Sequence, residues 1–197
     1  MFKLGLTGSI ATGKSTVLAA FAAQGVPTFS ADAAVHDLYA GEAVAPIEAE
    51  FPGVSHNGSI DRAELARHLV GNPERLRALE AIVHPLVRQK ITQFLANAEA
   101  QGADLVVVEI PLLYENGVDW GFDAVAVTSV GADEQRRRAL ARPGMSVEKL
   151  DAILARQMPQ AEKLKRADYA IDTSVSIAQT SAAVAQLVGK LRRENRA

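Results

Sequence analysis

The sequence contains no cysteine, which excludes disulfide bonds and thiolate metal sites and leaves no argument for an oxidising compartment. Aromatic residues make up only 5% of the chain, but hydrophobic residues reach 48% of its 197 residues, enough for one globular unit with a core. The apolar stretch at residues 2–6 is too short for a signal peptide or a membrane span. We therefore expect a cytoplasmic protein that does not enter a membrane.

The formal net charge is only −2, which argues against a protein that binds nucleic acid through bulk electrostatics. The charge is unevenly spread, because residues 133–166 carry a net +4 and the remainder of the chain carries −6. A solvated helix face is the ordinary explanation for most of these basic residues. A subset of them could instead close over an anion.

Short apolar runs alternate with helical patterns along the chain, and this alternation predicts an α/β fold built on a parallel sheet. The run LVVVEI has the β-branched, non-alternating composition of a strand that is covered on both faces. Strands are expected at residues 3–6, 26–29, 105–110, 124–130 and 169–172. A C-terminal helix over residues 176–193 is expected to pack on the sheet.

The segment 32–101 contains no convincing strand, and its helix signals predict a helical insertion between the second and third strands. Asp61 is an expected helix cap that can form a capping box with Glu64. Asn72, which precedes a proline, is a second expected cap, and Pro85 is expected to start the next helix.

Residues 133–166 are expected to form an arginine-rich pair of helices. The first helix is expected over residues 133–142 and the second over residues 147–157, with a Pro-Gly break between them and Ser146 as the cap of the second. Such a pair of helices would make a suitable lid over a bound ligand.

The stretch GLTGSIATGKST at residues 5–16 contains the pattern G-x-x-x-x-G-K-[ST], with a predicted strand before it and a predicted helix after it. In this context the glycines let the backbone wrap around phosphate oxygens, and backbone N–H groups at the helix start point at the anion. Lys14 would add a positive charge near the β and γ phosphates, and Ser15 would ligate Mg²⁺. The sequence therefore predicts a nucleoside triphosphate site.

The same loop also serves GTPase switches and ATP-driven machines, so it does not by itself indicate a kinase. The sequence lacks the Asn-Lys-x-Asp motif expected of a GTPase, and its length leaves little room for a separate machine. A nucleotide-binding regulatory protein without transfer activity stays an alternative.

Several acidic and apolar residues lie at or just after the ends of predicted strands, at the edge where ligands gather in α/β sheets. Asp32 could take a proton from an attacking hydroxyl or position a magnesium-bound water, or it could simply cap the next helix. Glu109 could order the hydration shell of magnesium or be structural, and the apolar residues 111–113 could line an acceptor pocket. His84 lies between apolar residues and is interpreted as a packed, hydrogen-bonded side chain rather than a catalytic one.

Taken together, these segments resemble the dephospho-coenzyme A kinase family over nearly the whole chain. The phosphate loop alone is common to many families. The more specific segments are SAD ending at Asp32, HP at His84, EIPLLYENG from Glu109, EQRRRALAR from Glu134 and ARQMPQAEKLKRADYAID from Ala155. Another small-metabolite or nucleotide kinase is the next alternative, but a shikimate or adenylate kinase would not be expected to carry HP, PLLYE and ADYAID in this order.

The resemblance implies ATP-dependent transfer to the ribose 3′-hydroxyl of dephospho-coenzyme A, the last step of coenzyme A synthesis. It implies a single P-loop kinase domain, whose parallel-sheet core spans residues 1–31, 102–132 and 167–197. It also implies a helical substrate-binding insertion at 32–101 and a helical lid at 133–166. The implied ligands are ATP, Mg²⁺ and the small-molecule substrate. Neither nucleic acid, a membrane nor an obligate protein partner is expected, and the chain is expected to act as a monomer.

Roles for individual residues also follow from the resemblance. Lys14 is implied to bridge phosphates, Asp32 to be the general base, and Arg138 to meet the phosphates from the lid. The implied ATP contacts are Gly8, Ala11, Thr12, Gly13, Lys14, Ser15, Thr16 and Arg142. The implied acceptor contacts are Thr7, Asp32, His84, Pro111, Leu112, Leu113 and Glu115. The implied magnesium ligands are Ser15, Asp32 and Glu109.

The chain departs from the usual family pattern at four positions. Ser9 and Ala11 stand where two glycines are common, which reduces backbone freedom in the phosphate loop. Ser30 replaces an acid two residues before Asp32, so any shared magnesium role would fall on Asp32 or on Glu109. Thr173 stands where asparagine is common, beside the expected adenine site.

Overall fold

The computed structural model of the chain describes residues 1–195, so the last two residues of the predicted 167–197 segment lie outside it. The described chain forms two compact units. The first comprises residues 1–29 together with the chain from residue 97 onward, and the second comprises residues 30–96.

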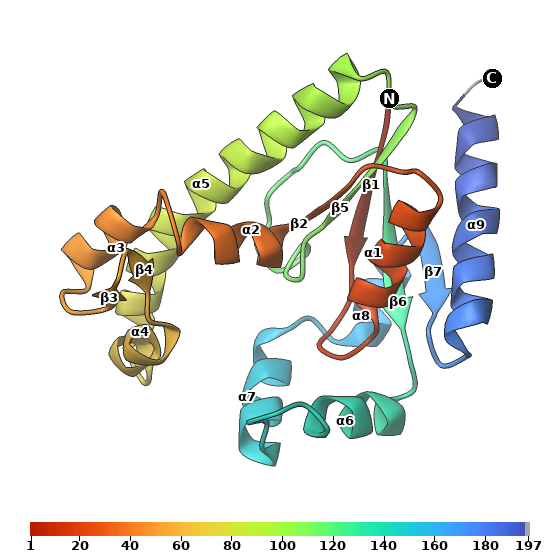
Figure 1. Cartoon of the computed structure of the whole chain (residues 1–197). Coiled ribbons are helices and arrows are strands. Elements are labelled where there is room, and N and C mark those ends of the chain that lie inside the picture. Colours follow the sequence, from red (N-terminus) through yellow and green to blue (C-terminus); the bar gives the residue numbers. More distant parts are fainter. Residues whose placement is uncertain (196–197) are drawn as a thin grey trace. The chain divides into compact units, whose positions relative to one another are not determined.

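A five-stranded sheet in the order β2-β5-β1-β6-β7 organises the first unit (Figure 1). The strands are β1 (Phe2–Thr7), β2 (Thr28–Ser30), β5 (Leu105–Glu109), β6 (Ala124–Ser129) and β7 (Tyr169–Asp172). The pairs β1–β5, β1–β6 and β6–β7 are parallel, and every residue of β5 is buried, as its continuous apolar run predicts. The predicted parallel α/β core is confirmed.

Helices α1 (Lys14–Ala23) and α9 (Ile177–Glu194) pack against each other beside this sheet (Figure 1). Leu4 and Leu6 of β1 join Phe21 of α1 and Val184 of α9 in one buried core. Because side chains alternate along a strand, Gly5 faces the opposite way, where it lies against the ring of Phe122. The predicted C-terminal helix is confirmed, and a capping box between Ser176 and Gln179 begins it.

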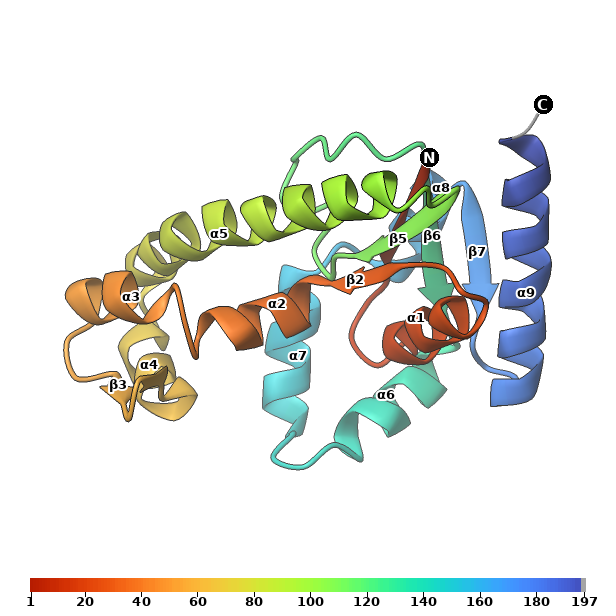
Figure 2. The ribbon, with the colours of Figure 1, turned by 45° about the horizontal axis from the view of Figure 1, so that its top comes forward.

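Three helices, α6 (Ala132–Leu140), α7 (Val147–Arg156) and α8 (Gln160–Arg166), follow β6 (Figure 2). The first two were predicted, and Ser146 caps α7 as expected by accepting a hydrogen bond from the Lys149 N–H at 3.2 Å. The third was not predicted, because its seven residues form only two turns between Pro159 and the strand β7.

The second unit is mainly helical, with α2 (Ala31–Leu38), α3 (Val44–Glu50), α4 (Arg62–Leu69) and most of α5 (Pro73–Ala100). The expectation that this segment has no strand is wrong, because β3 (Ser55–His56) and β4 (Ser59–Ile60) form a short antiparallel hairpin. The turn between them is Asn57-Gly58, with positive φ at both residues. This dipeptide is the strongest short-range hairpin signal, and it was available in the sequence.

Two of the expected helix boundaries in this unit are confirmed and one is wrong. The Asp61 carboxylate caps α4 by accepting from the Glu64 N–H at 3.1 Å, and Asn72 caps α5 by accepting from the Arg75 N–H at 3.1 Å. Pro85 does not start a helix, because α5 runs through it over 28 residues. Proline costs one hydrogen bond inside a helix, and the helical turns on both sides of Pro85 outweigh that loss. No helix among residues 1–195 is long and apolar enough to cross a membrane.

Candidate functional site

The loop between β1 and α1 presents a helix start to the solvent at the carboxyl end of the sheet. Gly13 is the N-cap of α1, with φ at 84°, and its lack of a side chain leaves the first N–H groups of the helix without a side-chain cap. Such N–H groups, at the positive end of the helix dipole, bind anions. The loop therefore has the backbone geometry of a phosphate site.

Close packing explains why the loop needs a glycine at its start. A Cβ added to Gly8 would lie 2.2 Å from Thr128 Oγ1 and 2.7 Å from Thr12 Oγ1. The two threonine hydroxyls are hydrogen-bonded to each other at 2.7 Å, and both residues are fully buried. Thr12 also donates to the Ser9 carbonyl at 2.8 Å, so its hydroxyl braces the loop from inside and only its backbone remains for a ligand.

Basic side chains gather at the open side of this loop. The Lys14 Nζ donates to the carbonyl oxygens of Gly8 at 3.0 Å and Ser9 at 3.3 Å, which holds its charge over the loop. Next to the loop is a cavity of about 310 Å³. Its lining combines loop residues, two arginines and a partly apolar rim: Ala11, Gly13, Ser15, Thr16, Arg138, Arg142, Thr173, Val175, Ile177 and Thr180. The composition of this cavity fits a nucleoside triphosphate.

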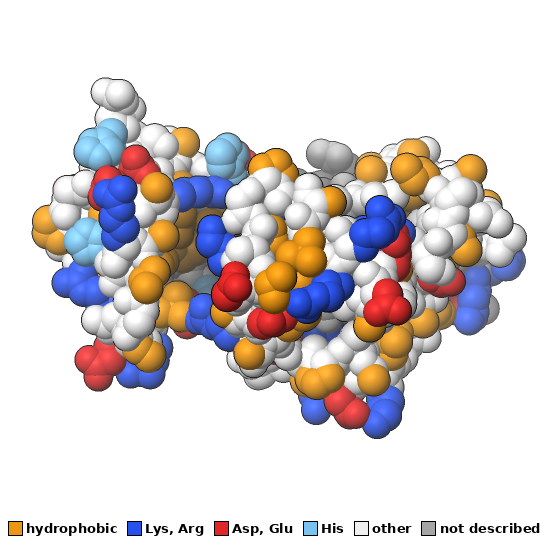
Figure 3. Space-filling model, turned by 90° about the horizontal axis from the view of Figure 1, so that it is seen from below, with side chains coloured by type: hydrophobic (Ala, Val, Ile, Leu, Met, Phe, Trp, Pro, Cys, Tyr) orange, Lys and Arg blue, Asp and Glu red, His pale blue; other side chains and the backbone are white. Residues whose placement is uncertain are grey.

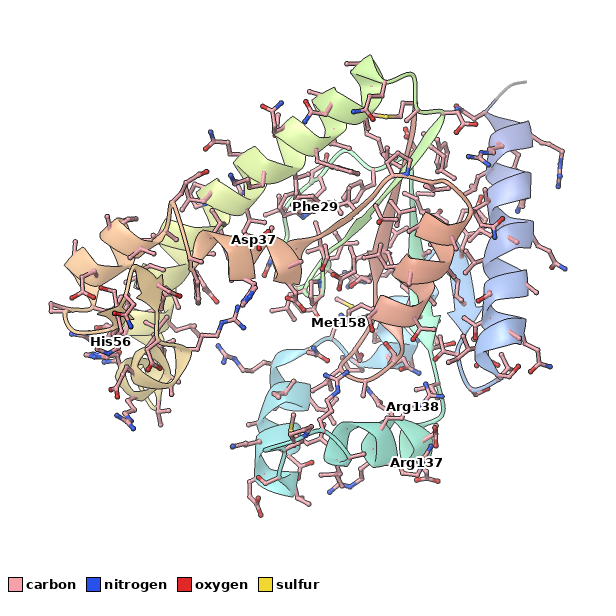
Figure 4. The ribbon with its side chains drawn as sticks, in the orientation of Figure 1. Phe29, Asp37, His56, Arg137, Arg138 and Met158 are labelled. Atoms are coloured by element: carbon pink, nitrogen blue, oxygen red, sulfur yellow. The ribbon has the colours of Figure 1, made fainter. Side chains whose placement is uncertain are left out.

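Arg138 is held in place on the wall of this cavity. Its Nη2 donates to the Thr173 carbonyl at 2.8 Å, its Nη1 donates to the Thr173 hydroxyl at 3.3 Å, and its Nε donates to Glu134 Oε1 at 2.7 Å. Arg137, its neighbour on α6 in Figure 4, also pairs with Glu134 but is 72% exposed at its side chain, against 29% for Arg138. Hydrogen bonds from Arg137, and then from Arg138, lower the pKa of Glu134 to about 2. The carboxylate is therefore ionised at neutral pH and steadies both arginines.

Thr173, the departure from the usual asparagine, links this wall to the phosphate loop. Its hydroxyl lies 2.9 Å from the Thr12 carbonyl and 3.1 Å from the Ser129 carbonyl, and the residue is buried. A Cβ on Gly13 would lie 3.1 Å from the Thr173 side chain. Thr173 therefore packs directly against the loop at the point where α1 begins.

The segment after β5 runs beside the phosphate loop. Glu109 is 4% exposed at the end of β5 and pairs in register with Leu6 of β1. The carbonyl of Pro111, two residues later, accepts a hydrogen bond from Thr7 Oγ1 at 3.1 Å. Leu113 is buried, and Leu112 is partly exposed. The structure thus brings together Thr7, Glu109 and Pro111. All three are among the residues that the resemblance implies as magnesium ligands or acceptor contacts.

Glu115, at the end of this segment, contacts Lys163, one of the basic residues in 133–166 for most of which a solvated helix face was the ordinary explanation. That explanation does not hold for Lys163, which is completely buried, with its Nζ 2.8 Å from Glu115 Oε1 and 3.3 Å from the Pro111 carbonyl. The same Glu115 oxygen accepts from the Met158 N–H at 2.7 Å. Burying a charged lysine without an opposite charge is costly, and Glu115 supplies that charge here. The carboxylate therefore anchors the segment internally.

Asp32 belongs to the second unit and lies in the first turn of α2. The alternative that it caps this helix is wrong, because Ser30 is the N-cap and accepts from the Ala33 N–H at 3.4 Å. The side chain of Asp32 is exposed and lines a cavity of about 480 Å³. The other residues that line this cavity are Val35, Tyr39, Arg62, Leu65, Ala66, Leu69 and Leu79. Asp32 is thus free to meet a ligand.

The interior of this second cavity is mixed in character. The guanidinium of Arg62 lies 5.4 Å from the centre of the Tyr39 ring and within hydrogen-bonding distance of His36 Nδ1, at 3.1 Å. Burial raises the pKa of the Tyr39 hydroxyl above its usual value. Leucine side chains form much of the remaining wall. A ligand with both apolar and anionic parts would suit this lining.

His84 lies elsewhere on the second unit than the sequence suggested. It is exposed on α5, so the interpretation as a packed core histidine is wrong, and it is absent from the lining of the cavity that holds Asp32. Its place between apolar residues is explained by the helix, because Val83 and Val87 are buried while His84 faces outward.

Sequence reasoning missed several polar residues that shape the site. Thr128 carries no motif that would reveal it, whereas Lys163 falls inside the ARQMPQAEKLKRADYAID segment. Gln135 and Gln157, which contact the phosphate loop, also fall within recognised segments.

No group of three or more metal-ligating side chains occurs within residues 1–195. On the face viewed in Figure 3, basic and acidic side chains are interspersed rather than gathered in one basic field.

The chain is similar to known proteins over nearly all of its length. The family model described as dephospho-CoA kinase matches residues 2–179. A dephospho-CoA kinase of Rhizobium etli is 51% identical over 192 residues, which are 98% of this chain and 95% of that protein. A crystal structure from Thermus thermophilus has a TM-score of 0.82 at 35% identity, covering 96% of this chain and 97% of its own. The dephospho-CoA kinase of Campylobacter jejuni has a TM-score of 0.66 at 27% identity, covering 96% of each chain.

These likenesses extend over the whole phosphate loop, the segment after β5 and the arginine-bearing helices, so they include every part of the site described above. Structural similarity covers both the sheet and the helical second unit. The predicted family resemblance, α/β kinase fold and phosphotransferase class are confirmed, and a kinase of this kind uses ATP and acts on a small molecule. The chain belongs to the dephospho-CoA kinase family.

Proposed function

We propose that this protein transfers the γ-phosphoryl group of ATP to the ribose 3′-hydroxyl of dephospho-coenzyme A. The observation that carries the proposal is the family match over residues 2–179 combined with an intact phosphate loop. Residues 30–96 would bind the acceptor, and residues 133–166 would act as a lid. Cytoplasmic localisation and action as a monomer stay predictions from the sequence.

On the donor side, ATP would lie in the cavity beside α1. The N–H groups of the loop and of the helix start would hold the phosphates, together with Lys14. Val175 and Ile177 offer apolar surface at the rim, 41% and 72% exposed, suited to a purine face. Arg138 and Arg142 line the same cavity and would neutralise charge on the transferred group.

Ser15, which lines the donor cavity, and Glu109, at the end of β5, would hold a magnesium ion. Both supply oxygen ligands, and the ion needs only one or two protein groups in addition to phosphate oxygens and water. When bound, Mg²⁺ would neutralise charge on the β and γ phosphates. Asp32 was also expected to share this role, and its participation stays a prediction.

On the acceptor side, Asp32 would take the proton of the 3′-hydroxyl. Its exposure on α2 and its place in the lining of the 480 Å³ cavity support this role. Arg62 would supply a cation for the anionic part of the acceptor, and the leucines would meet its apolar part. His84 and residues 111–113 remain predicted acceptor contacts, whereas the Glu115 carboxylate is engaged with Lys163.

Asp32→Asn tests the base assignment, because the amide keeps the shape of the side chain but cannot take a proton. We expect ATP affinity to stay within about twofold and kcat to fall by about 10²–10⁴-fold, the range typical of a lost general base. Asp37→Asn, an exposed carboxylate on the same helix (Figure 4), is the matched control and should transfer at the parental rate. Transfer by Asp32→Asn at a rate similar to that of Asp37→Asn would remove Asp32 as the base.

The remaining alternative is another small-molecule acceptor on the same fold. Activity of the parent protein with adenosine, AMP or shikimate, and none with dephospho-coenzyme A, would favour it. ATP binding without transfer to any acceptor would favour the regulatory alternative.

A further inference from the structure

The peptide groups of Ile10, in the middle of the phosphate loop, are held by two glutamine side chains. The Ile10 N–H donates to Gln157 Oε1 at 2.9 Å, and the Ile10 carbonyl accepts from Gln135 Nε2 at 2.8 Å. An N–H can only donate and a carbonyl can only accept, so these partners fix which end of each amide faces the loop. We call this pair of contacts the Ile10 clamp.

The two glutamines come from the lid helices, which also hold the next loop residue by apolar contact. Gln135 is in α6, and Gln157 is the C-cap of α7. Ala11 packs with Ala139 of α6 and Leu150 of α7 in a small buried core. The partly buried residues around that core are Ile10, Leu140, Met145 and Leu154. The lid helices therefore grip two consecutive loop residues by both polar and apolar contacts.

Ala11 explains why the loop needs such support. Its φ is 60°, in the left-handed region that a residue with a Cβ rarely adopts. A backbone in this conformation persists where its surroundings hold it there. Glycine, common at this position in the family, would adopt it without strain but would leave out the methyl group that Ala139 and Leu150 bury. In this chain, packing against the lid helices stabilises at Ala11 the backbone conformation that glycine would adopt freely.

We propose that Gln135 and Gln157 are positioning residues for the triphosphate. By fixing the Ile10 peptide they set the direction of the backbone from Ala11 to Gly13, whose N–H groups would cradle the phosphates. The same contacts tie the phosphate loop to the helix that carries Arg138, so that loop and lid are ordered together. The inference rests on the loop binding ATP, as in the proposed function, but it does not depend on which acceptor is used.

The chain contains a matched control for this role. Gln160 of α8 donates from its Nε2 to the Val130 carbonyl at 2.8 Å, in a part-buried site outside the loop. The bond thus has the same donor type, acceptor type and length as that of Gln135. A contribution of such a bond to the stability of the fold would appear in variants of all three glutamines. A contribution to phosphate binding would appear only in variants of Gln135 and Gln157.

The experiment compares Gln135→Met, Gln157→Met and Gln160→Met in the full-length protein. Dissociation constants for ATP and for adenosine are measured by calorimetry and NMR titration, and thermal unfolding is recorded for each variant. We expect ATP to bind about tenfold more weakly to each clamp variant, equivalent to about 1.4 kcal/mol, with unchanged adenosine binding. Gln160→Met should lower the unfolding temperature by about as much as the two clamp variants do, but it should bind ATP like the parent.

A second pair of variants tests the direction of each hydrogen bond. Gln157→Glu keeps an acceptor for the Ile10 N–H, whereas Gln135→Glu places an acceptor against the Ile10 carbonyl. Both add one negative charge, so the charge itself cannot separate them. We expect Gln157→Glu to bind ATP several-fold more tightly than Gln135→Glu.

Three results would overturn the inference: parental ATP affinity in both clamp methionine variants, an equal loss of ATP affinity in Gln160→Met, or equal losses for ATP and adenosine. Because these titrations omit the acceptor, failure to phosphorylate dephospho-coenzyme A would overturn the proposed function without altering them. The clamp and the acceptor assignment can therefore fail independently.

Discussion

The Lys163 ammonium lies 2.8 Å from the Glu115 carboxylate, and none of the lysine side chain is exposed. The pair fastens α8 to the segment that follows β5, and the Pro111 carbonyl completes the lysine's surroundings at 3.3 Å. Burying both charges is costly in itself, so the pair defines the arrangement of these segments more than it adds net stability.

Removing one partner of this pair should be strongly destabilising. Lys163→Met leaves the Glu115 carboxylate buried without its cation, at an expected loss of about 3–5 kcal/mol in the free energy of unfolding. Lys165→Met, which removes an exposed lysine paired with Glu162, should cost less than about 1 kcal/mol. Urea unfolding measures both. Equal losses in the two variants would contradict the structural role assigned to Lys163.

The Glu134 carboxylate gives a pH signature. Its pKa is lowered from 4.5 to about 2 in the folded protein, first by Arg137 and then by Arg138, so its contribution to stability is present above about pH 4.5. That contribution is lost as the pH falls toward 2. We expect the stability difference between the parent and Glu134→Gln to be constant from pH 8 to pH 5.5 and to shrink below pH 4.5. A difference that grows on acidification would contradict the assignment.

A methyl group at Gly8 should displace the phosphate loop. The added Cβ would lie 2.2 Å from Thr128 Oγ1 and 3.1 Å from the Thr128 carbonyl, so the loop must shift. We expect Gly8→Ala to weaken ATP binding by at least about 100-fold and to cost about 1–3 kcal/mol in stability. Gly131→Ala, where a Cβ meets nothing within 4 Å, should be close to neutral in both measurements. Retained ATP affinity in Gly8→Ala would mean that the close packing is not required.

Variants of Arg138 and Arg137 distinguish a role in phosphoryl transfer from a role in the surface ion pair, since both side chains bind Glu134. Arg138→Ala should lower kcat by about 10²–10³-fold, because this guanidinium would meet charge that develops on the transferred group. ATP affinity should fall by less than kcat does. Arg137→Ala should change kcat by less than about twofold, because the side chain is 72% exposed. Equal binding and turnover in Arg138→Ala and the parent would make Arg138 an ordinary surface residue.

Local pattern was sufficient for the sheet, the phosphate loop and most helix caps. The run before Glu109 and the Gly8–Ser15 pattern are both local, so strand and loop follow from neighbouring residues alone. Pro85 misled the prediction because the propensity of one residue is outweighed by the helical turns on both sides of it. The β3–β4 hairpin was missed although its Asn57-Gly58 turn was visible in the sequence.

Contacts between distant segments account for what the sequence did not reveal. In the sequence, Lys163 resembles the other solvated basic residues. Only the fold, which brings α8 beside Glu115, 48 positions away, shows that it is buried. Gln157 meets Ile10 across 147 positions, and Thr128 meets Thr12 across 116. No periodicity encodes such pairs, because they depend on how the helices pack on the sheet.

The most direct test of the central claim is to incubate the purified chain with ATP, Mg²⁺ and dephospho-coenzyme A and to identify the product by mass and phosphorus NMR. Adenosine, AMP and shikimate serve as competing acceptors. The account predicts one equivalent of ADP for each 3′-phosphorylated product, formed only from dephospho-coenzyme A. Phosphorylation of another acceptor in preference, or ATP binding with no transfer to dephospho-coenzyme A, would contradict it.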